Sequence, residues 1–175
     1  LKLSTTKKPL WLLYTEDKIE FMHHNPVEVI KTNDWEKECR LAQKKFGIRN
    51  PLILTSKSIL KPFNLTSIFL SESIFSDINP DPTFESCQDA IDFVGMSKFD
   101  GVIAIGGGSV IDMGKLISIF SVNKGPFQDY LLGDKKYQAR ENKFVAVPTT
   151  AGSGSESTHF AVVYDGITKH SVAHS

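Results

Sequence analysis

GVIAIGGGSVIDMGK, residues 101–115, is the most informative stretch of this sequence. Its first residues, Gly101 to Ile105, form a short apolar run that is typical of a buried strand. Three glycines end this run abruptly, and a pattern of helical period then extends from Ser109 to about Phe120. The order of strand, glycine loop and helix predicts a unit of a parallel α/β domain.

The glycine loop is suited to holding phosphate. Gly106, Gly107 and Gly108 carry no Cβ, so the chain can turn tightly and approach an anion closely. The amides of the first helical turn would then point at the anion, aided by the helix dipole. A plain strand-to-helix turn is the alternative, but each glycine costs roughly 0.5 to 1 kcal/mol of chain entropy, and a turn does not require three.

Two polar residues follow the glycines. Ser109 can either cap the helix or donate its hydroxyl to a phosphate oxygen. Asp112, three residues later, resembles the reciprocal arm of a capping box. We therefore expect Asp112 to be structural rather than catalytic.

Three better-known loops do not fit this sequence. The dinucleotide fingerprint GxGxxG needs a third glycine where Ile111 stands. The phosphate loop of NTPases needs Ser or Thr after its lysine, whereas Leu116 follows Lys115. The nucleophile elbow GxSxG is absent. The loop is therefore a glycine loop of another kind.

The rest of the chain alternates between short β-rich runs and stretches of helical period. This alternation predicts a layered α/β domain with parallel strands. The Asn-Pro-Asp-Pro segment at residues 79–82 breaks the pattern, since proline removes a backbone donor. Asn33 or Asp34 is the expected N-cap of the first helix. Strands are expected at residues 9–14, 27–31, 51–55, 67–70 and 144–147, and further helices at residues 33–46 and 83–98.

Composition excludes several classes of protein. A chain of 175 residues with 41% hydrophobic and 23% charged side chains can bury one globular core. Its 20 basic and 20 acidic residues balance, and no stretch approaches the ~20 apolar residues of a membrane span, so neither nucleic acid nor a membrane is an expected partner. Cys39 and Cys87 show no metal or disulfide spacing, so we expect two free thiols and a cytoplasmic location.

A second polar motif, PTTAGSGSES at residues 148–157, directly follows the expected strand at 144–147. Its glycines and hydroxyl residues would also suit a flexible linker. The strand before it and the apolar run at residues 160–164 after it argue against a linker, which would need neither.

Together, GGGSVID and VPTTAGSGSE resemble the paired signature of the iron-containing, or group III, alcohol dehydrogenases, a family whose fold is similar to that of dehydroquinate synthase and glycerol dehydrogenase. The resemblance runs from about Asn25 to the end of the chain. It implies a Rossmann-like α/β domain with a parallel sheet at residues 25–175, preceded at residues 1–24 by an extension or early strand. The family's helical C-terminal domain is expected to lie beyond this chain.

The resemblance also implies cofactor contacts. The glycine loop that holds the dinucleotide pyrophosphate in the family falls on Gly107, Gly108 and Ser109. The threonines that line the cofactor site fall on Thr149 and Thr150.

Three further positions follow from the same resemblance. Ser153 stands where a threonine is frequent, and Lys169 matches a lysine that touches the cofactor ribose or phosphate. Asp81 stands where an asparagine is frequent and is expected to border the same cleft.

Cofactor choice depends on one departure from the family. Many relatives end the strand at 51–55 with an aspartate that hydrogen-bonds the adenosine ribose, whereas this chain has Ser56. A carboxylate would repel a ribose phosphate, while Ser56 and the adjacent Lys57 would accept one. NADP is therefore as plausible a cofactor as NAD. The alternative is that Ser56 is an ordinary turn residue.

The family's iron, or another divalent ion such as zinc, is held by one aspartate and three histidines on the helical domain. We therefore expect no metal ligand and no catalytic residue in this chain, and no activity from the chain alone. The histidines present lack metal-ligand spacing with a supporting carboxylate, and each is expected to be solvated or hydrogen-bonded. They are His23, His24, His159, His170 and His174.

The implied function is that of the NAD(P)-binding portion of a metal-dependent alcohol dehydrogenase or aldehyde reductase, which transfers hydride between nicotinamide and a small alcohol or aldehyde. THFAVVY at residues 158–164 resembles the branch that reduces phosphonoacetaldehyde. The alternatives are a non-catalytic nucleotide-binding fragment and an enzyme like dehydroquinate synthase or glycerol dehydrogenase. A homodimer is an open alternative to a monomer.

Overall fold

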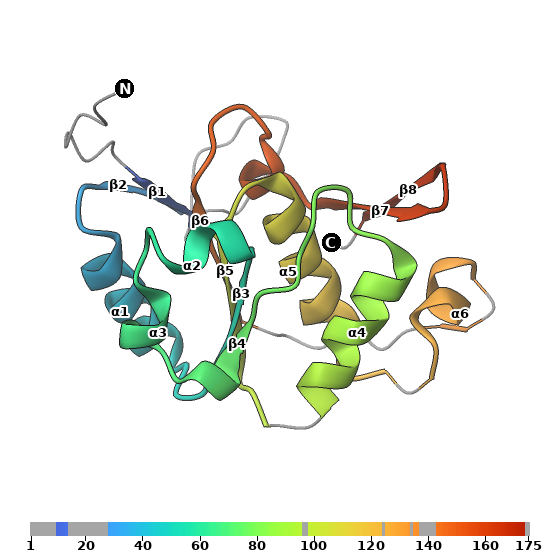
Figure 1. Ribbon diagram of the computed structural model, residues 1–175, viewed down its shortest axis with the longest axis horizontal. Helices are drawn as coiled ribbons and strands as arrows, with labels where there is room; N and C mark the ends of the chain where they lie inside the picture. The colour runs from blue at the N-terminus through green and yellow to red at the C-terminus, as the bar shows by residue number, and fades with distance from the viewer. Residues whose placement is uncertain are drawn as a thin grey trace, which may run out of the picture.

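The computed structural model describes residues 10–13, 28–95, 98–123, 125–133, 135–136 and 143–173. These residues form a six-stranded sheet of order β2-β1-β6-β5-β3-β4 and a separate hairpin, β7-β8 (Figure 1). The strands are β1 (Leu10–Leu13), β2 (Val29–Thr32), β3 (Pro51–Thr55), β4 (Ile74–Phe75), β5 (Gly101–Gly106), β6 (Lys143–Pro148), β7 (Phe160–Asp165) and β8 (Thr168–Ala173).

The predicted α/β class is confirmed, and the expected parallel pairing holds for the part of the sheet that carries the motifs. β6, β5, β3 and β4 are parallel neighbours. β1 instead pairs antiparallel with both β2 and β6. The expected strands at 9–14 and 27–31 therefore exist, but they add an antiparallel edge to a parallel sheet.

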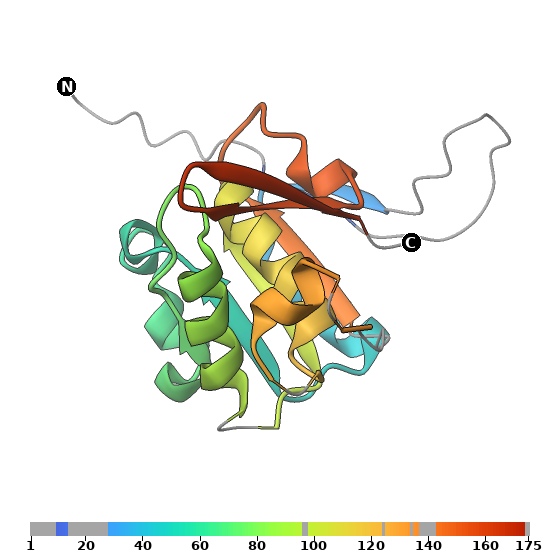
Figure 2. The ribbon, with the colours of Figure 1, turned by 90° about the vertical axis from the view of Figure 1, so that its right-hand side faces the viewer.

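Helices cover both faces of the sheet, which explains why the central strands are apolar throughout. Every residue of β5 is buried. Leu54 and Ala104 pack in one core with α4 (Phe84–Gly95) and α5 (Gly108–Phe120). Ile53 and Ile103 belong to a second core on the opposite face, together with residues of α1 (Trp35–Phe46). Figure 1 shows the sheet between these two layers, and Figure 2 shows α4 and α5 in front of it.

The first helix begins and ends as its sequence predicts. Asp34 is the N-cap of α1, and its Oδ1 accepts the Lys37 amide at 3.2 Å. Gly47 closes the helix at φ 62°, a left-handed conformation that glycine adopts without steric cost. The amide of Ile48 then donates to the carbonyl of Gln43 at 2.8 Å.

The expected strand at residues 67–70 is wrong. This segment holds the end of α3 (Leu65–Ile68), and the short strand β4 follows only at Ile74. The apolar residues Leu65, Ile68 and Phe69 are spaced three and four apart, which places them on one helical face. Leu65 is fully buried in the second core, so this face packs against the sheet.

The order of the parallel strands reverses between β3 and β5. The chain leaves β3 through α2 (Lys57–Leu60) and α3 and returns as β4, with both helices on the face that α1 covers. It leaves β5 through α5 and returns as β6 on the other side of β5, with α5 on the opposite face. Such a reversal leaves a crevice at the carboxyl ends of the two strands, where open α/β sheets bind ligands.

The β7-β8 hairpin lies across α5, as the two ribbon views show (Figures 1 and 2). Ala161 and Val163 of β7 are buried in the same core as α5. The amide of Tyr164 donates to the carbonyl of Pro82 at 2.8 Å, which ties the hairpin to the segment before α4. The remaining short helices are α6 (Phe127–Leu131), η1 (Ser71–Ser73) and η2 (Ser155–Ser157). Within the described ranges, none of the helices has the length and apolar character that crossing a membrane requires.

Candidate functional site

A cleft of about 270 Å³ opens at the carboxyl ends of the parallel strands. Its walls come from the segments that follow β3, β4, β5 and β6, so it lies at the point where the strand order reverses. Ten residues line it: Ser56, Ser58, Ile78, Asn79, Pro80, Gly107, Gly108, Ser109, Val110 and Thr150.

The loop needs glycines because there is no room for side chains, and not because of its backbone conformation. None of its three glycines has a positive φ. A Cβ on Gly106 would lie 2.6 Å from a methyl carbon of Val110, and one on Gly108 would lie 3.0 Å from Cβ of Ser153. A Cβ on Gly107 would lie 3.1 Å from Oγ1 of Thr150. The loop is therefore packed directly against the segment after β6, and side chains would force the two apart.

Helix α5 begins one residue earlier than its sequence suggests, at Gly108, with Gly107 as the N-cap. The amides of Val110 and Ile111 both donate to the carbonyl of Gly107, at 3.1 Å each. The amides of Gly108 and Ser109 precede the first intrahelical hydrogen bond, and both residues line the cleft. The helix therefore presents backbone donors, with the positive end of its dipole, to whatever the cleft holds.

The interpretation of Ser109 as a cap is wrong, because Ser109 is the second residue of the helix. Its Oγ instead accepts the amide of Asp81 at 3.3 Å. The predicted capping box fails for the same reason, since the third helical position is Val110 and not Asp112. Asp112 is nevertheless structural, as expected, but through different partners.

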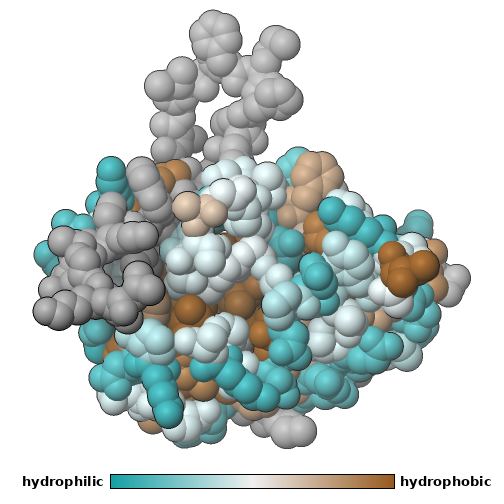
Figure 3. Space-filling model, turned by 45° about the horizontal axis from the view of Figure 1, so that its top comes forward, coloured by the Kyte–Doolittle hydropathy of each residue, from teal (hydrophilic) through white to brown (hydrophobic). Residues whose placement is uncertain are grey.

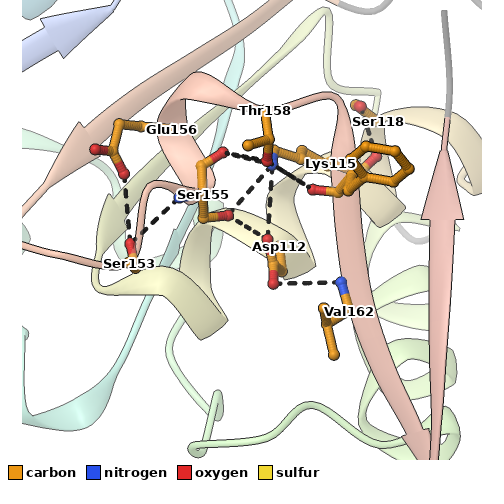
Figure 4. Close-up of polar contacts among 9 residues, drawn as sticks. Asp112, Lys115, Ser118, Ser153, Ser155, Glu156, Thr158 and Val162 are labelled. Atoms are coloured by element: carbon orange, nitrogen blue, oxygen red, sulfur yellow. Dashed lines mark hydrogen bonds and ion pairs between the residues drawn. The ribbon is translucent and has the colours of Figure 1, made fainter.

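Asp112 connects α5 to the chain after β6 (Figure 4). One carboxylate oxygen accepts the hydroxyl of Ser155, and the other accepts the amide of Val162 at 3.3 Å. Ser155 belongs to the PTTAGSGSES motif and Val162 to β7. The residue therefore joins the helix to two later elements.

Lys115 completes this connection one turn along α5. Its Nζ donates to the carbonyls of Ser155 and Phe160, at 2.5 Å each, and to Oγ1 of Thr158 at 3.3 Å (Figure 4). Burial lowers the pKa of Lys115 below its ordinary value, and the nearby Asp112 carboxylate opposes this shift. Lys115 therefore holds residues 155–160 against α5, next to the place where the glycine loop packs against the PTTAGSGSES motif.

The hydroxyl residues of the PTT motif differ in their surroundings. The Thr149 amide donates to the carbonyl of Gly106 at 2.9 Å, which holds the motif against the glycine loop. Oγ1 of Thr149 is buried and makes no hydrogen bond within the described residues. Thr150 lines the cleft, and Ser153 donates to Oε2 of Glu156 at 3.4 Å. Buried hydroxyls are normally satisfied, so the Thr149 hydroxyl is an unpaired polar group, as far as the described residues show, one position before the lining residue Thr150.

Ser56 lies at the cleft as expected, but Lys57 is engaged. Oγ of Ser56 lies 2.9 Å from Oγ of Ser58, and both residues line the cleft. Nζ of Lys57 forms an ion pair with Asp77 at 2.8 Å. A ribose phosphate would therefore compete with the Asp77 carboxylate for Lys57.

Four expected site residues lie outside the cleft lining: Asp81, Thr149, Ser153 and Lys169. Asp81 has a positive φ of 56°, and its backbone amide donates a hydrogen bond to Oγ of the lining residue Ser109. Lys169 is exposed on β8. Conversely, the sequence interpretation missed Ser58, Asn79 and its neighbours as lining residues. Their positions could have indicated this role, because Ser58 follows a strand closely and Asn79 lies beside a proline, and loops that follow parallel strands lie at the carboxyl edge of the sheet.

The histidines within the described ranges do not gather into a site. His159 lies beside its neighbour Phe160 with ring centroids 4.0 Å apart. The ring of His170 lies 5.2 Å from that of Phe84, and its Nε2 is buried without a hydrogen-bond partner among described residues, so the expectation of a solvated or hydrogen-bonded ring is not met at that atom. His23, His24 and His174 fall outside the described residues. No group of three or more His, Cys, Asp or Glu side chains suited to a metal ion occurs in the part of the chain that the structure describes.

The surface on this side of the molecule mixes apolar and polar character. Figure 3, in which the top of Figure 1 comes forward, shows apolar residues at the floor of a hollow and more polar residues around it. The cleft lining shows the same mixture, with Ile78, Pro80 and Val110 beside three serines and a threonine. Small-molecule sites combine apolar walls with a few polar groups in this way.

Comparison with known proteins agrees with this architecture. The profile of the family described as iron-containing alcohol dehydrogenase matches residues 26–175. Long-chain-alcohol dehydrogenase 1 of Geobacillus thermodenitrificans is 32% identical over 140 residues, which cover 75% of this chain and 35% of that protein. NAD-dependent methanol dehydrogenase of Bacillus methanolicus is 32% identical over 142 residues, covering 76% and 36% of the two chains.

A solved structure shows the same fold. The NADH-dependent butanol dehydrogenase A of Thermotoga maritima superposes with a TM-score of 0.71 at 23% identity, over 89% of this chain and 41% of that chain. This chain thus spans about a third of the length of the curated relatives reported above. The family profile covers both the glycine loop and the PTTAGSGSES motif that pack together in the structure. The chain belongs to the iron-containing alcohol dehydrogenase family.

Proposed function

We propose that this chain is the dinucleotide-binding part of an NAD(P)-dependent alcohol dehydrogenase or aldehyde reductase. One observation supports the proposal most. The N-terminus of α5 and the glycine loop before it line a cleft at the point where the strand order reverses. The domain that performs this role is residues 25–175, as the sequence suggests. Residues 1–24 precede it, and their described part is β1, which lies between β2 and β6 in the sheet.

The residues around the cleft fit a dinucleotide. The amides of Gly108 and Ser109 and the hydroxyl of Ser109 are donors for the pyrophosphate oxygens. Gly107 also lines the cleft, and a Cβ added there would lie 3.1 Å from Oγ1 of Thr150, so a side chain would crowd this wall of the site. The hydroxyls of Ser56 and Ser58 suit the diol of the adenosine ribose, because each can both donate and accept.

The buried hydroxyl of Thr149 is a further candidate contact, since its missing hydrogen bond is one that a cofactor oxygen or amide can supply. Thr150 lines the cleft, whereas Ser153, on the other side of the bend at Gly152, does not line it and lies against Gly108 of the glycine loop. Lys169 and Asp81 are proposed contacts on the resemblance alone, because neither lines the cleft in this structure.

When bound, the nicotinamide supplies the hydride donor or acceptor for a small alcohol or aldehyde. The residues of this chain bind and orient it, and we assign none of them a proton-transfer step. The divalent metal that the family resemblance implies finds no donor set among the described residues, so no step is assigned to a metal here. The resemblance of residues 158–164 to the phosphonoacetaldehyde-reducing branch makes phosphonoacetaldehyde the first aldehyde to test with a longer protein.

The test is calorimetric titration of this 175-residue chain with NAD⁺ and with NADP⁺. We expect saturable binding of at least one of them. Gly108→Val, which pushes a side chain into the space held by Ser153, should weaken that binding at least about tenfold, equivalent to about 1.4 kcal/mol.

Gly95→Val is the matched control, because a Cβ at Gly95 meets no atom within 4 Å. It should leave the affinity unchanged within a factor of about two, or about 0.4 kcal/mol. A chain that binds neither dinucleotide would contradict the proposal, as would a Gly108→Val variant that binds like the parent.

A further inference from the structure

An exposed ion pair borders the end of the cleft that follows β3. Nζ of Lys57 lies 2.8 Å from Oδ1 of Asp77, and 71% and 64% of the two side chains are exposed. The backbone holds the pair in place, because Ser56 and Asp77 form an isolated antiparallel bridge between the ends of β3 and β4.

The pair adjoins the cleft from both strands. Lys57 lies between Ser56 and Ser58, which both line the cleft, and Asp77 directly precedes the lining residue Ile78. The hydroxyls of Ser56 and Ser58 lie 2.9 Å apart at the same end. A group attached to a ribose bound at these hydroxyls would therefore meet the lysine and the aspartate first.

We propose that Asp77 is a specificity-determining residue, which disfavours a dinucleotide carrying a ribose phosphate by engaging Lys57 and by presenting its own negative charge. This inference rests on the proposed function, because it concerns the same cleft. It adds a residue that follows β4 to a choice that the sequence analysis assigned to Ser56 and Lys57, directly after β3.

Two physical effects act in the same direction. A ribose phosphate needs a cation, and Lys57, which lies between the two cleft serines, already has a carboxylate partner. Juxtaposed like charges also oppose binding, so the Asp77 carboxylate repels the phosphate. Since exposed ion pairs are weak and screened by salt, Lys57 can exchange Asp77 for another anion, and the aspartate reduces phosphate binding rather than abolishing it.

The experiment is titration of the 175-residue chain and its Asp77→Asn variant with NAD⁺ and with NADP⁺, at low and at high ionic strength. The variant keeps the shape of the side chain and removes its charge. We expect its affinity for NADP⁺ to rise at least about threefold at low salt and its affinity for NAD⁺ to stay within about twofold. The gain should shrink at high salt, which a purely structural effect would not do.

Two further variants make the result specific. Asp129→Asn is the matched control, because Asp129 pairs with Lys135 at 2.7 Å on a part of the chain that does not line the cleft. It should leave both affinities unchanged. The double variant with Lys57→Met and Asp77→Asn should show a smaller gain than Asp77→Asn alone, because the freed lysine is missing.

The outcomes separate the two proposals. If the parent binds NAD⁺ or NADP⁺ and Asp77→Asn leaves their affinity ratio unchanged, the role of Asp77 is wrong and the proposed function stands. An equal gain in the Asp129→Asn control would overturn it as well, because the effect would then reflect total charge. A parent that binds neither dinucleotide contradicts both.

Discussion

Nζ of Lys115 lies 3.7 Å from Oδ1 of Asp112, one turn earlier in α5, and only 11% and 14% of the two side chains are exposed. The two residues also bind Ser155, Phe160 and Val162, which lie 40 or more positions later in the chain. The helix that presents its N-terminus to the cleft is therefore joined at its second and third turns to the PTTAGSGSES motif and to β7. This connection keeps the glycine loop and the motif packed together.

Replacing Lys115 by methionine should destabilise the fold markedly. The change leaves the covered Asp112 carboxylate without its cation and four later oxygen atoms, in Ser155, Thr158 and Phe160, without this donor. Breaking a fully buried pair costs about 3 to 5 kcal/mol, and we expect about 2 kcal/mol here because both side chains keep some exposure. Urea unfolding of parent and variant measures the difference.

Lys135→Met is the matched control for this substitution, since Lys135 pairs with Asp129 in a more exposed setting, with 45% and 33% of the side chains exposed. Its effect on the free energy of unfolding should be much smaller. Equal effects of the two substitutions would mean that the network around Lys115 does not stabilise the loop packing.

Much of the fold could be predicted from the sequence because its periodic segments are unambiguous. The buried strands at 51–55, 101–105 and 144–147 and the helix after the glycine loop lie where the hydrophobic pattern places them, and the first helix begins after its predicted cap, Asp34. The strand expected at 67–70 failed because Leu65, Ile68 and Phe69 suit a helical face as well as a short strand. Short apolar runs do not distinguish the two by pattern alone.

The site was harder to predict than the fold, because its contacts join residues that are distant in sequence. Gly107 lies against Thr150, and Gly108 lies against Ser153, and the motifs alone indicated only that these segments belong together. The partners of Asp112 could not be foreseen, since a capping box is local and Ser155 is 43 positions away. The Lys57 and Asp77 pair, 20 positions apart, depends on a bridge between two strand ends that the sequence does not announce.

Both cysteines should be protected in the folded chain. They are free and buried, and burial raises the pKa of Cys39 to about 11 and that of Cys87 to about 12. The thiolate is the reactive form, so both thiols stay protonated and covered at neutral pH. We expect a thiol reagent to modify the folded chain at least about tenfold more slowly than the urea-unfolded chain. Rapid modification of either thiol without denaturant would contradict this packing.

The 175-residue chain should bind a dinucleotide without oxidising alcohols. The described residues form a cleft with hydrogen-bond donors for a phosphate, but they include no cluster of metal ligands. We expect no turnover of ethanol, butanol or the matching aldehydes above the rate without protein, whether or not Fe²⁺ or Zn²⁺ is added. The change in NADH absorbance measures this turnover, and the binding titration serves as the positive control. Metal-dependent turnover by the pure chain would show that it contains a complete catalytic site.

Replacing Ser56 by aspartate should shift cofactor preference toward NAD. Ser56 directly follows β3 and lines the cleft, so a carboxylate there would face a bound ribose together with Asp77. It would accept hydrogen bonds from a ribose diol and repel a ribose phosphate, and like-charge juxtaposition can cost several kcal/mol. We expect the ratio of NADP⁺ to NAD⁺ affinity to fall at least about tenfold, or about 1.4 kcal/mol, in titrations of the variant against the parent. Thr66→Asp adds the same charge on exposed α3, outside the cleft lining, and should leave the ratio unchanged. A ratio that Ser56→Asp does not move would mean that a different residue contacts the ribose.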